Sequence, residues 1–333
     1  MQHLGFPLYT IIIFILFVVA ALFVDLVGHK NDKIMSLKSA SLWSIFWVLV
    51  SVVFGVFLYY EHGGEMAKLF FAGYILEKSL SVDNLFVIMA IFTWFKIPQN
   101  YRHKVLYFGI LGAIVFRLIF VAIGSGLFML GSWMQIIFGL VVLYSAILML
   151  KNNDSDDEIE DYSNHLAYKF VYKYFSVFPK IVGHSFFINE NTAQSELNKN
   201  PNLNFLNKKT WLIATPLFLC LCVIEVSDVM FAFDSVPAVI AVSQEPLIIY
   251  SAMIFAILGL RAMYFVLESL KKYLVYLEKS VIVLLFFIGF KIIINALNAM
   301  FDLEFEISST ISLIAIFAIL GFGVLASVFV GKK

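Results

Sequence analysis

Residues 77–84 read EKSLSVDN, and residues 228–235 read DVMFAFDS. Both segments place an acid at the first position, an Asp at the seventh, and an amide or hydroxyl residue at the eighth. Each lies inside a long apolar run, where a carboxylate is costly and points to a functional site. The sequence therefore predicts one organising feature, a duplicated acidic motif buried in apolar segments.

Composition places these motifs in a membrane protein. The 333 residues are 62% hydrophobic and only 14% charged, with a mean hydropathy of +0.93. Soluble domains average roughly 45–50% apolar and about 25% charged residues. The net charge of zero argues against a nucleic-acid partner. We therefore expect an all-α polytopic membrane protein whose main partner is the lipid bilayer.

Hydropathy predicts about nine transmembrane helices, since roughly 20 apolar residues suffice to cross a bilayer. The predicted segments are residues 8–27, 42–60, 66–95, 105–124, 127–150, 211–242, 247–267, 275–295 and 307–330. They divide the chain into two N-terminal helices (1–65), a first unit (66–150), a cytoplasmic loop (151–210), a second unit (211–296), and a last helix with a short tail (297–333).

The Lys and Arg residues of the connections predict the orientation. Connections after the first, third, fifth and seventh segments are rich in lysine, and the chain ends in two lysines. The alternate connections have Lys68 as their only candidate cation. Because positive loops stay in the cytoplasm, we expect the N-terminus outside and the C-terminus inside. The loop 151–210 is then cytoplasmic and is a possible docking site for a protein partner.

On this topology the two motifs enter the membrane from opposite sides, which is typical of an inverted-topology repeat of three-helix units. The two acids of one motif are six residues apart, roughly 120° around a continuous helix, so they do not face one point. Local unwinding at 80–84 and 231–235 would let them converge, and Pro237 favours such a break. We state the unwinding as a hypothesis.

The candidate site is made of oxygen ligands. Carboxylate, amide and hydroxyl oxygens favour Mn²⁺, Ca²⁺ or Mg²⁺ over Zn²⁺ or Cu⁺, and no histidine falls in a predicted segment. No organic cofactor is expected. The candidate ligands are Glu77, Asp83, Asn84, Asp228, Asp234 and Ser235, with Asp25, Glu225 and Ser81 as further ligands or proton carriers. Charge balance is assigned to Arg117, Arg261 and Lys291; the alternative is a purely structural network of acids and bases.

Residues 73–87, 224–242 and 255–265 resemble the TerC family of integral membrane proteins, in particular its Alx-like branch. The resemblance covers roughly residues 73–296. It implies a bacterial inner-membrane protein associated with tellurite resistance by name and with manganese homeostasis, including Mn²⁺ efflux. The family's acidic motifs fall on Glu77, Asp83, Asp228 and Asp234, with Asn84 and Ser235 beside them.

Together these observations predict a transporter that exports a divalent cation, with Mn²⁺ as the named candidate, in exchange for protons. The alternative is a non-transporting scaffold that binds metal to regulate partners or to supply metal to them. An intramembrane aspartyl protease is disfavoured, because Ser-Val and Ala-Phe precede Asp83 and Asp234 where such proteases carry Gly-x-Gly. We therefore do not expect an enzyme.

Overall fold

The computed structural model describes residues 2–3, 6–27, 36–152, 162–200, 205, 212–270, 275–301 and 307–330. Within these ranges the side chains of Asp83 and Asp234 are among those not described, so both predicted ligands lie outside what the structure places. The acidic run 154–161 also lies outside the described residues.

Long helices make up most of the described chain. The first five are α1 (Leu8–Val27), α2 (Leu37–His62), α3 (Gly64–Trp94), α4 (Gln99–Phe128) and α5 (Ser132–Asn152). After the loop come α8 (Pro216–Val242), α9 (Pro246–Ile257), α10 (Leu260–Leu270), α11 (Val275–Phe301) and α12 (Ser309–Val330). Proline begins α8 and α9, where its missing N–H costs no helical hydrogen bond.

The helical membrane fold is confirmed. In the described ranges seven helices are long and apolar enough to cross a membrane, and the bent pair α9–α10 makes eight if it counts as one span. Helix α3 has 31 residues, ample for a crossing, but carries Glu77, Lys78 and Asp83 near its middle. The predicted number of nine is therefore approximate and is reached if α3 also crosses.

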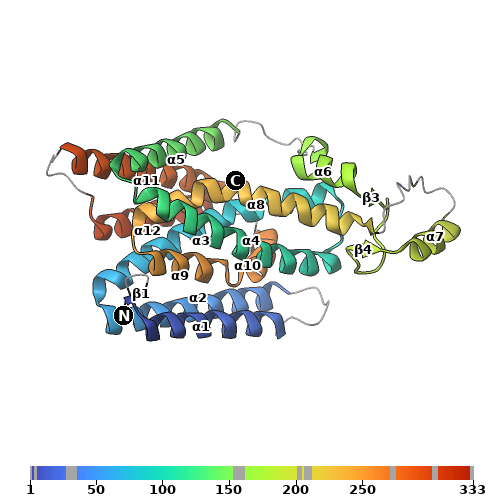
Figure 1. The fold of residues 1–333 in the computed structure, drawn as a ribbon, viewed down its shortest axis with the longest axis horizontal. Helices are drawn as coiled ribbons and strands as arrows, with labels where there is room; N and C mark the ends of the chain where they lie inside the picture. The colour runs from blue at the N-terminus through green and yellow to red at the C-terminus, as the bar shows by residue number, and fades with distance from the viewer. Residues whose placement is uncertain are drawn as a thin grey trace.

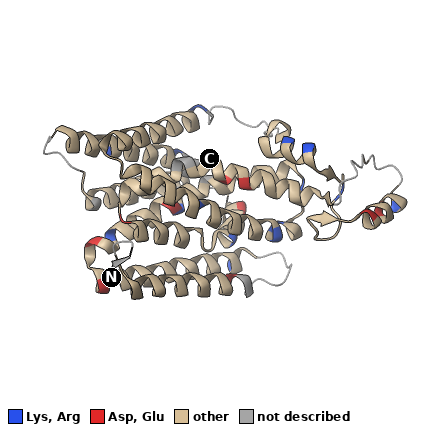
Figure 2. Ribbon diagram, in the orientation of Figure 1, with Lys and Arg blue, Asp and Glu red and all other residues tan. Residues whose placement is uncertain are grey.

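The helices form one elongated bundle (Figure 1). Helices α1 and α2 lie along one side, α5 and α11 along the opposite side, and α3, α4, α8 and α9 lie between them. Figure 2 shows an almost uncharged bundle with a few acids and bases near its centre. The charges of the site therefore sit among apolar side chains rather than at the surface.

The contacts between helices have the pattern that an inverted repeat predicts, in which each helix of one unit can be exchanged for its counterpart in the other. Helix α4 packs against α8, and α9 packs in the same way against α3. Helices α3 and α8 contact each other, as do α5 and α11. Exchanging α3, α4 and α5 for α8, α9 and α11 therefore maps these contacts onto one another. The repeat itself stays a prediction.

The predicted unwinding at the motifs is wrong. Helix α3 runs without interruption through residues 77–84, and α8 runs through 228–235 and past Pro237 to Val242. A proline inside a membrane helix is tolerated where neighbouring groups satisfy the freed carbonyl. The acids therefore project from continuous helices.

The break lies instead in the predicted segment 247–267. Helices α9 and α10 meet at an angle of 51° around Gly259, whose φ is +76°. Such a φ is natural for glycine and strained for other residues, and the ring of Trp47 occupies the space where a Cβ would lie. The single helix predicted here is therefore two half-helices.

The loop after α5 forms a small unit at one end of the bundle (Figure 1). It contains the short turn η1 (Tyr162–Asn164), α6 (Leu166–Tyr174) and α7 (Glu190–Lys199). The strands β3 (Ser176–Val177), β5 (Ile213–Ala214) and β4 (Phe187–Ile188) pair in that order, while β1 (Gln2–His3) pairs with β2 (Phe6–Pro7) at the N-terminus. Helix α7 falls in an Asn-rich stretch, and Asn189 caps it, accepting from the Thr192 N–H at 3.0 Å.

Candidate functional site

The centre of the bundle holds an ion-pair cluster built from three helices. Arg117 of α4 pairs with Glu77 of α3, and its Nη2 atom lies 3.3 Å from Oδ1 of Asp228 on α8. Arg117 is 2% exposed and Glu77 is fully buried. One guanidinium thus neutralises the first acid of both motifs, because its donors form a fork that can serve two carboxylates at once.

Two further polar residues of α3 join this cluster. With its amide oriented by its hydrogen bonds, Asn84 accepts from Nη2 of Arg117 at 3.3 Å and donates to the Leu80 carbonyl at 3.3 Å. Ser81 donates its hydroxyl to Oε1 of Glu77 at 3.5 Å. The structure therefore brings together Glu77, Ser81, Asn84, Arg117 and Asp228.

Several oxygens of the cluster lack a partner. Oε2 of Glu77 and Oδ2 of Asp228 are buried without a hydrogen bond among the described atoms. A cavity of about 30 Å³ adjoins Asp228; Ser81, Asn84 and Asp228 form its polar part, and the rest of its wall is apolar. Roughly 10–15 Å³ of such volume suffices for one water. The cavity can therefore hold a water or a small ion next to oxygen ligands.

Glu225 lies one turn before Asp228 on α8 and packs against the backbone of α4. A Cβ added to Gly112 would lie 2.1 Å from Oε1 of Glu225. Its Oε2 atom is also buried without a hydrogen-bond partner in the part of the chain that is described. Glycine at position 112 therefore makes the room that this carboxylate occupies.

This arrangement keeps the Arg117 guanidinium between two carboxylates. A buried pair recovers its desolvation cost only with good geometry, and removal of one member typically costs about 3–5 kcal/mol. Two carboxylates on neighbouring helices with unpaired oxygens, one of them lining a small cavity, can bind a cation where Arg117 withdraws. In this structure the two carboxylates are neutralised by Arg117.

Other predicted site residues lie elsewhere. Arg261 Nη2 is 3.3 Å from Oδ1 of Asp25 and donates to the Asp25 carbonyl at 2.6 Å, so this pair joins α10 to α1. Lys291 donates to the Ala241 carbonyl at 3.4 Å. Ser235 is 2% exposed, and its hydroxyl has no hydrogen-bond partner among the described atoms.

Two histidines lie in membrane helices, contrary to the sequence prediction: His62 is the last residue of α2, and His103 lies in α4. Helix α4 begins at Gln99 rather than near 105, so it includes His103. The ring of His103 packs at 4.3 Å from the Phe265 ring. It lies 14 residues from Arg117, about 21 Å along α4, and so does not join the carboxylates.

Sequence reasoning missed a second polar layer. Arg102 pairs with Glu268 of α10, donates to the Tyr264 hydroxyl at 3.2 Å and to the Ile97 carbonyl at 2.9 Å, and its guanidinium lies over the Phe92 ring. Arg102 is 15 residues from Arg117, about 22 Å along α4. The cavity lies between these two arginine layers. Arg102 falls in a predicted connection between two membrane segments, where charged residues are common. Its pairing with Glu268 could therefore not be expected from the sequence.

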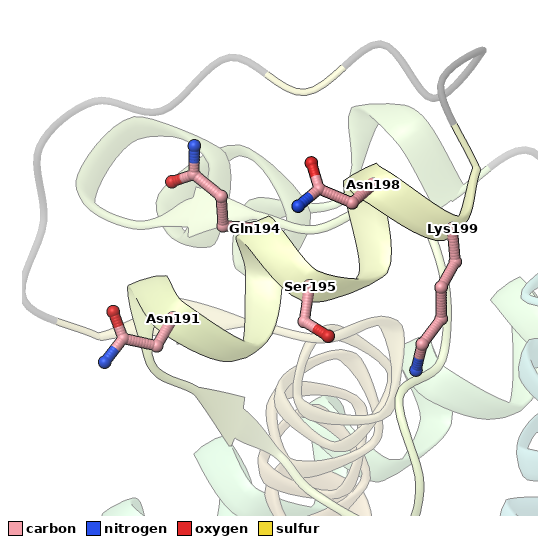
Figure 3. A pocket seen from close by; sticks show the side chains of 5 residues that line it. All are labelled: Asn191, Gln194, Ser195, Asn198 and Lys199. Atoms are coloured by element: carbon pink, nitrogen blue, oxygen red, sulfur yellow. The ribbon is translucent and has the colours of Figure 1, made fainter.

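A separate surface groove lies in another part of the molecule. It lies along α7, and its lining side chains are Asn191, Gln194, Ser195, Asn198 and Lys199 (Figure 3). The groove contains amides, a hydroxyl and an ammonium but no carboxylate. It is therefore not part of the ion-pair cluster around Arg117.

Comparison with known proteins identifies the family. The model described as "Integral membrane protein TerC family" matches residues 62–333. The chain belongs to the TerC family. No solved structure matches it.

Several TerC relatives match nearly the whole chain. The "Tellurium resistance protein TerC" of Serratia marcescens is 58% identical over 334 residues, covering 99% of this chain and 96% of its own length. A protein of the same name from an Alcaligenes species is 56% identical, with the same coverage. A relative named Alx, from Photorhabdus laumondii, is 35% identical over 81% of this chain and 80% of its own. The predicted family is confirmed; the relatives named for tellurium resistance are more similar than the Alx relative.

Proposed function

We propose that this TerC family protein transports a divalent cation across the membrane, with Mn²⁺ as the preferred candidate. The observation that carries the proposal is Arg117 held between Glu77 and Asp228, next to a small cavity to which Ser81, Asn84 and Asp228 contribute polar atoms. The tellurium resistance named for the relatives accords with a role in handling inorganic ions.

Exchange between the arginine and the substrate is the proposed central step. A divalent cation in the cavity meets oxygens of Asp228, Asn84 and Ser81. As it binds, Arg117 leaves the carboxylates, and when the cation departs the guanidinium returns and neutralises them. The site is thus never left as two unpaired buried anions, whose burial would cost several kcal/mol each.

The proposed substrate class follows from the ligands. Carboxylate, amide and hydroxyl oxygens suit Mn²⁺, Ca²⁺ and Mg²⁺, and the family resemblance favours Mn²⁺. Carboxylates must lose their protons when they bind a metal, so metal binding and proton binding compete at one site. This competition is the proposed basis of exchange with protons, for which Glu225 is a further carrier.

Purified protein in liposomes tests the proposal. Uptake of Mn²⁺ is measured with an enclosed metal-sensitive dye, with and without a pH gradient, and then with Ca²⁺ and Mg²⁺. Glu77→Gln, Asp228→Asn, Asp83→Asn and Asp234→Asn should each lower the flux at least about tenfold, equal to 1.4 kcal/mol of binding free energy. Glu65→Gln, an exposed acid of the same helix, is the matched control and should keep the wild-type flux. Equal flux in Glu77→Gln and Glu65→Gln would overturn the proposal.

A non-transporting metal-binding scaffold is the second candidate. Its support is the unit of α6, α7 and the three-stranded sheet, which places a polar groove outside the bundle (Figures 1 and 3). The scaffold predicts saturable binding of Mn²⁺ to the purified protein without flux in liposomes. Flux that depends on Glu77 and Asp228 excludes it.

The proposed orientation places the N-terminus outside the cytoplasm and the α6–α7 unit inside, in a bacterial inner membrane. It rests on the lysine bias of the connections. Labelling of single introduced cysteines with a membrane-impermeant reagent in intact cells tests it. Cysteine at Tyr60 should react and cysteine at Asn198 should not.

A further inference from the structure

The break between α9 and α10 contains the ammonium of a partly buried lysine. Nζ of Lys78 donates to the Ala256 carbonyl at 2.9 Å and to the Leu258 carbonyl at 3.1 Å. These carbonyls belong to the C-terminal end of α9, where the last C=O groups have no helical partner and carry a partial negative charge. Lys78 therefore provides a cap from another helix, 178 and 180 residues away in sequence.

This cation has carbonyl partners rather than a carboxylate. Among the described side chains, no acid forms an ion pair with Lys78, although Glu77 precedes it on α3. Glu77 points instead to Arg117 on α4. Adjacent residues of a helix are about 100° apart. Helix α3 therefore directs the Glu77 carboxylate to the ion-pair cluster and the Lys78 ammonium to the break.

Helix α10 is attached to the bundle by polar contacts at both ends. Near the break Arg261 pairs with Asp25 of α1, and near the far end Glu268 pairs with Arg102 of α4. At the break itself, Leu260, the first residue of α10, forms part of the cavity wall next to Asp228. The break at Gly259 separates this short helix from α9. Helix α10 is thus a discrete element whose first residue lines the cavity.

We propose that Lys78 is a positioning residue for transport: its ammonium holds the end of α9 and keeps the α9–α10 helix bent, so that α10 can act as the gate of the cation cavity. The gating role rests on the proposed function, whereas the positioning of the bend by Lys78 does not. Lys78 acts as a tethered cation at a half-helix terminus, the kind of site at which transporters bind free cations.

The physical reason lies in the two carbonyls. Without an ammonium they would face an apolar interior unpaired, and a buried polar group without a hydrogen bond is costly. Straightening α9 into α10 would give them backbone N–H donors of the next turn. Loss of Lys78 should therefore shift the pair toward one continuous helix.

The bend is measured as a distance. Spin labels at Gln244→Cys and Ser269→Cys, both exposed positions, flank the α9–α10 pair in a protein that carries Cys220→Ala and Cys222→Ala. Straightening a 51° bend between helices of 12 and 11 residues lengthens the end-to-end distance by about 3 Å. Lys78→Met should show this lengthening and lose Mn²⁺ flux at least tenfold. Lys68→Met, on the same helix and exposed, should change neither.

Chemical rescue separates a tethered cation from a merely structural lysine. Lys78→Arg should keep the short distance, and ethylammonium added to Lys78→Ala should restore it, whereas ethanol should not. If Lys78→Met does not insert, the Lys78→Ala series alone decides. A short distance in Lys78→Met, or in Lys78→Ala without amine, would overturn the proposal. Rescued bending without Mn²⁺ flux even in the wild type would sustain the positioning role of Lys78 and remove the proposed transport function.

Discussion

Nη2 of Arg117 lies 3.3 Å from Oδ1 of Asp228 while the same guanidinium pairs with Glu77. Helices α3 and α8 each contribute the first acid of their motif, and α4 contributes the cation between them. The two acids of a single motif do not need to converge, because the shared point is reached from two helices. This explains how continuous helices can still form one site.

The first prediction concerns the energy of this cluster. Arg117→Met leaves two buried carboxylates without a counter-charge and should lower the free energy of unfolding by about 3–5 kcal/mol. Thermal unfolding in detergent measures the loss. The double variant Glu77→Gln, Arg117→Met should lose clearly less than the sum of the two single changes, because it removes the unpaired charge together with its partner. Additive losses would show that the two residues are not energetically coupled.

The second prediction concerns Gly112, which makes room for Glu225. Gly112→Ala should displace the flexible carboxylate rather than the helix, so the protein should still fold while Mn²⁺ affinity or flux changes. Gly126→Ala is the matched control, since it lies on the same helix and its added Cβ would meet nothing within 4 Å. Both changes should raise helix propensity by about 0.5–1 kcal/mol. The same flux in both variants would remove Glu225 from the transport site.

The third prediction concerns the bend itself. Gly259→Ala combines an unfavourable φ of +76° with a clash against the Trp47 ring at 2.5 Å. Gly63→Ala has a φ of +88° but no neighbour within 4 Å, so it isolates the backbone cost, about 1–3 kcal/mol. Gly259→Ala should cost about 1–3 kcal/mol more by overpacking. Unfolding midpoints of the two variants give the difference, and equal midpoints would contradict the packing of Trp47 against the break.

The fourth prediction concerns the layer at Arg102. Cys220 is fully buried on α8, in one apolar cluster with Leu260 and Tyr264 of α10, and Cys222→Ala leaves it as the only cysteine. Arg102→Ala removes the contact to Glu268 and should ease local opening. An opening made easier by 1.4 kcal/mol raises the rate of thiol labelling about tenfold. Lys96→Ala, an exposed cation before α4, should label at the wild-type rate. Unchanged labelling of Arg102→Ala would show that this layer does not restrain α10.

Much of the fold could be read from the sequence because hydropathy is a local property. The first predicted segment, 8–27, coincides with α1 (Leu8–Val27), and the eighth begins where α11 begins. Boundaries were poorer where polar residues extend a helix beyond its apolar part. Helix α4 begins at Gln99, six residues before the predicted start, and thereby brings Arg102 and His103 into the helix.

The candidate site could be predicted as a set of residue types, but not as a set of contacts. The duplicated acids and the intramembrane arginines stand out in the sequence because charge is rare in apolar segments. That Arg117 serves both motifs, and that Asp25 belongs to Arg261 instead, depends on which helices are neighbours. Those contacts join residues between 40 and 236 positions apart.

Sequence alone determined that the chain is a helical membrane protein of the TerC family with a repeated acidic motif in apolar surroundings, because composition and motif spacing are carried by the chain itself. Only the tertiary structure decided that the motif helices are continuous, that the bend lies at Gly259, and that Lys78 caps it. A helix can break where donors from other elements satisfy its terminal carbonyls and where the surrounding side chains leave space for the changed backbone. Both the Lys78 ammonium and the Trp47 ring come from helices distant in sequence.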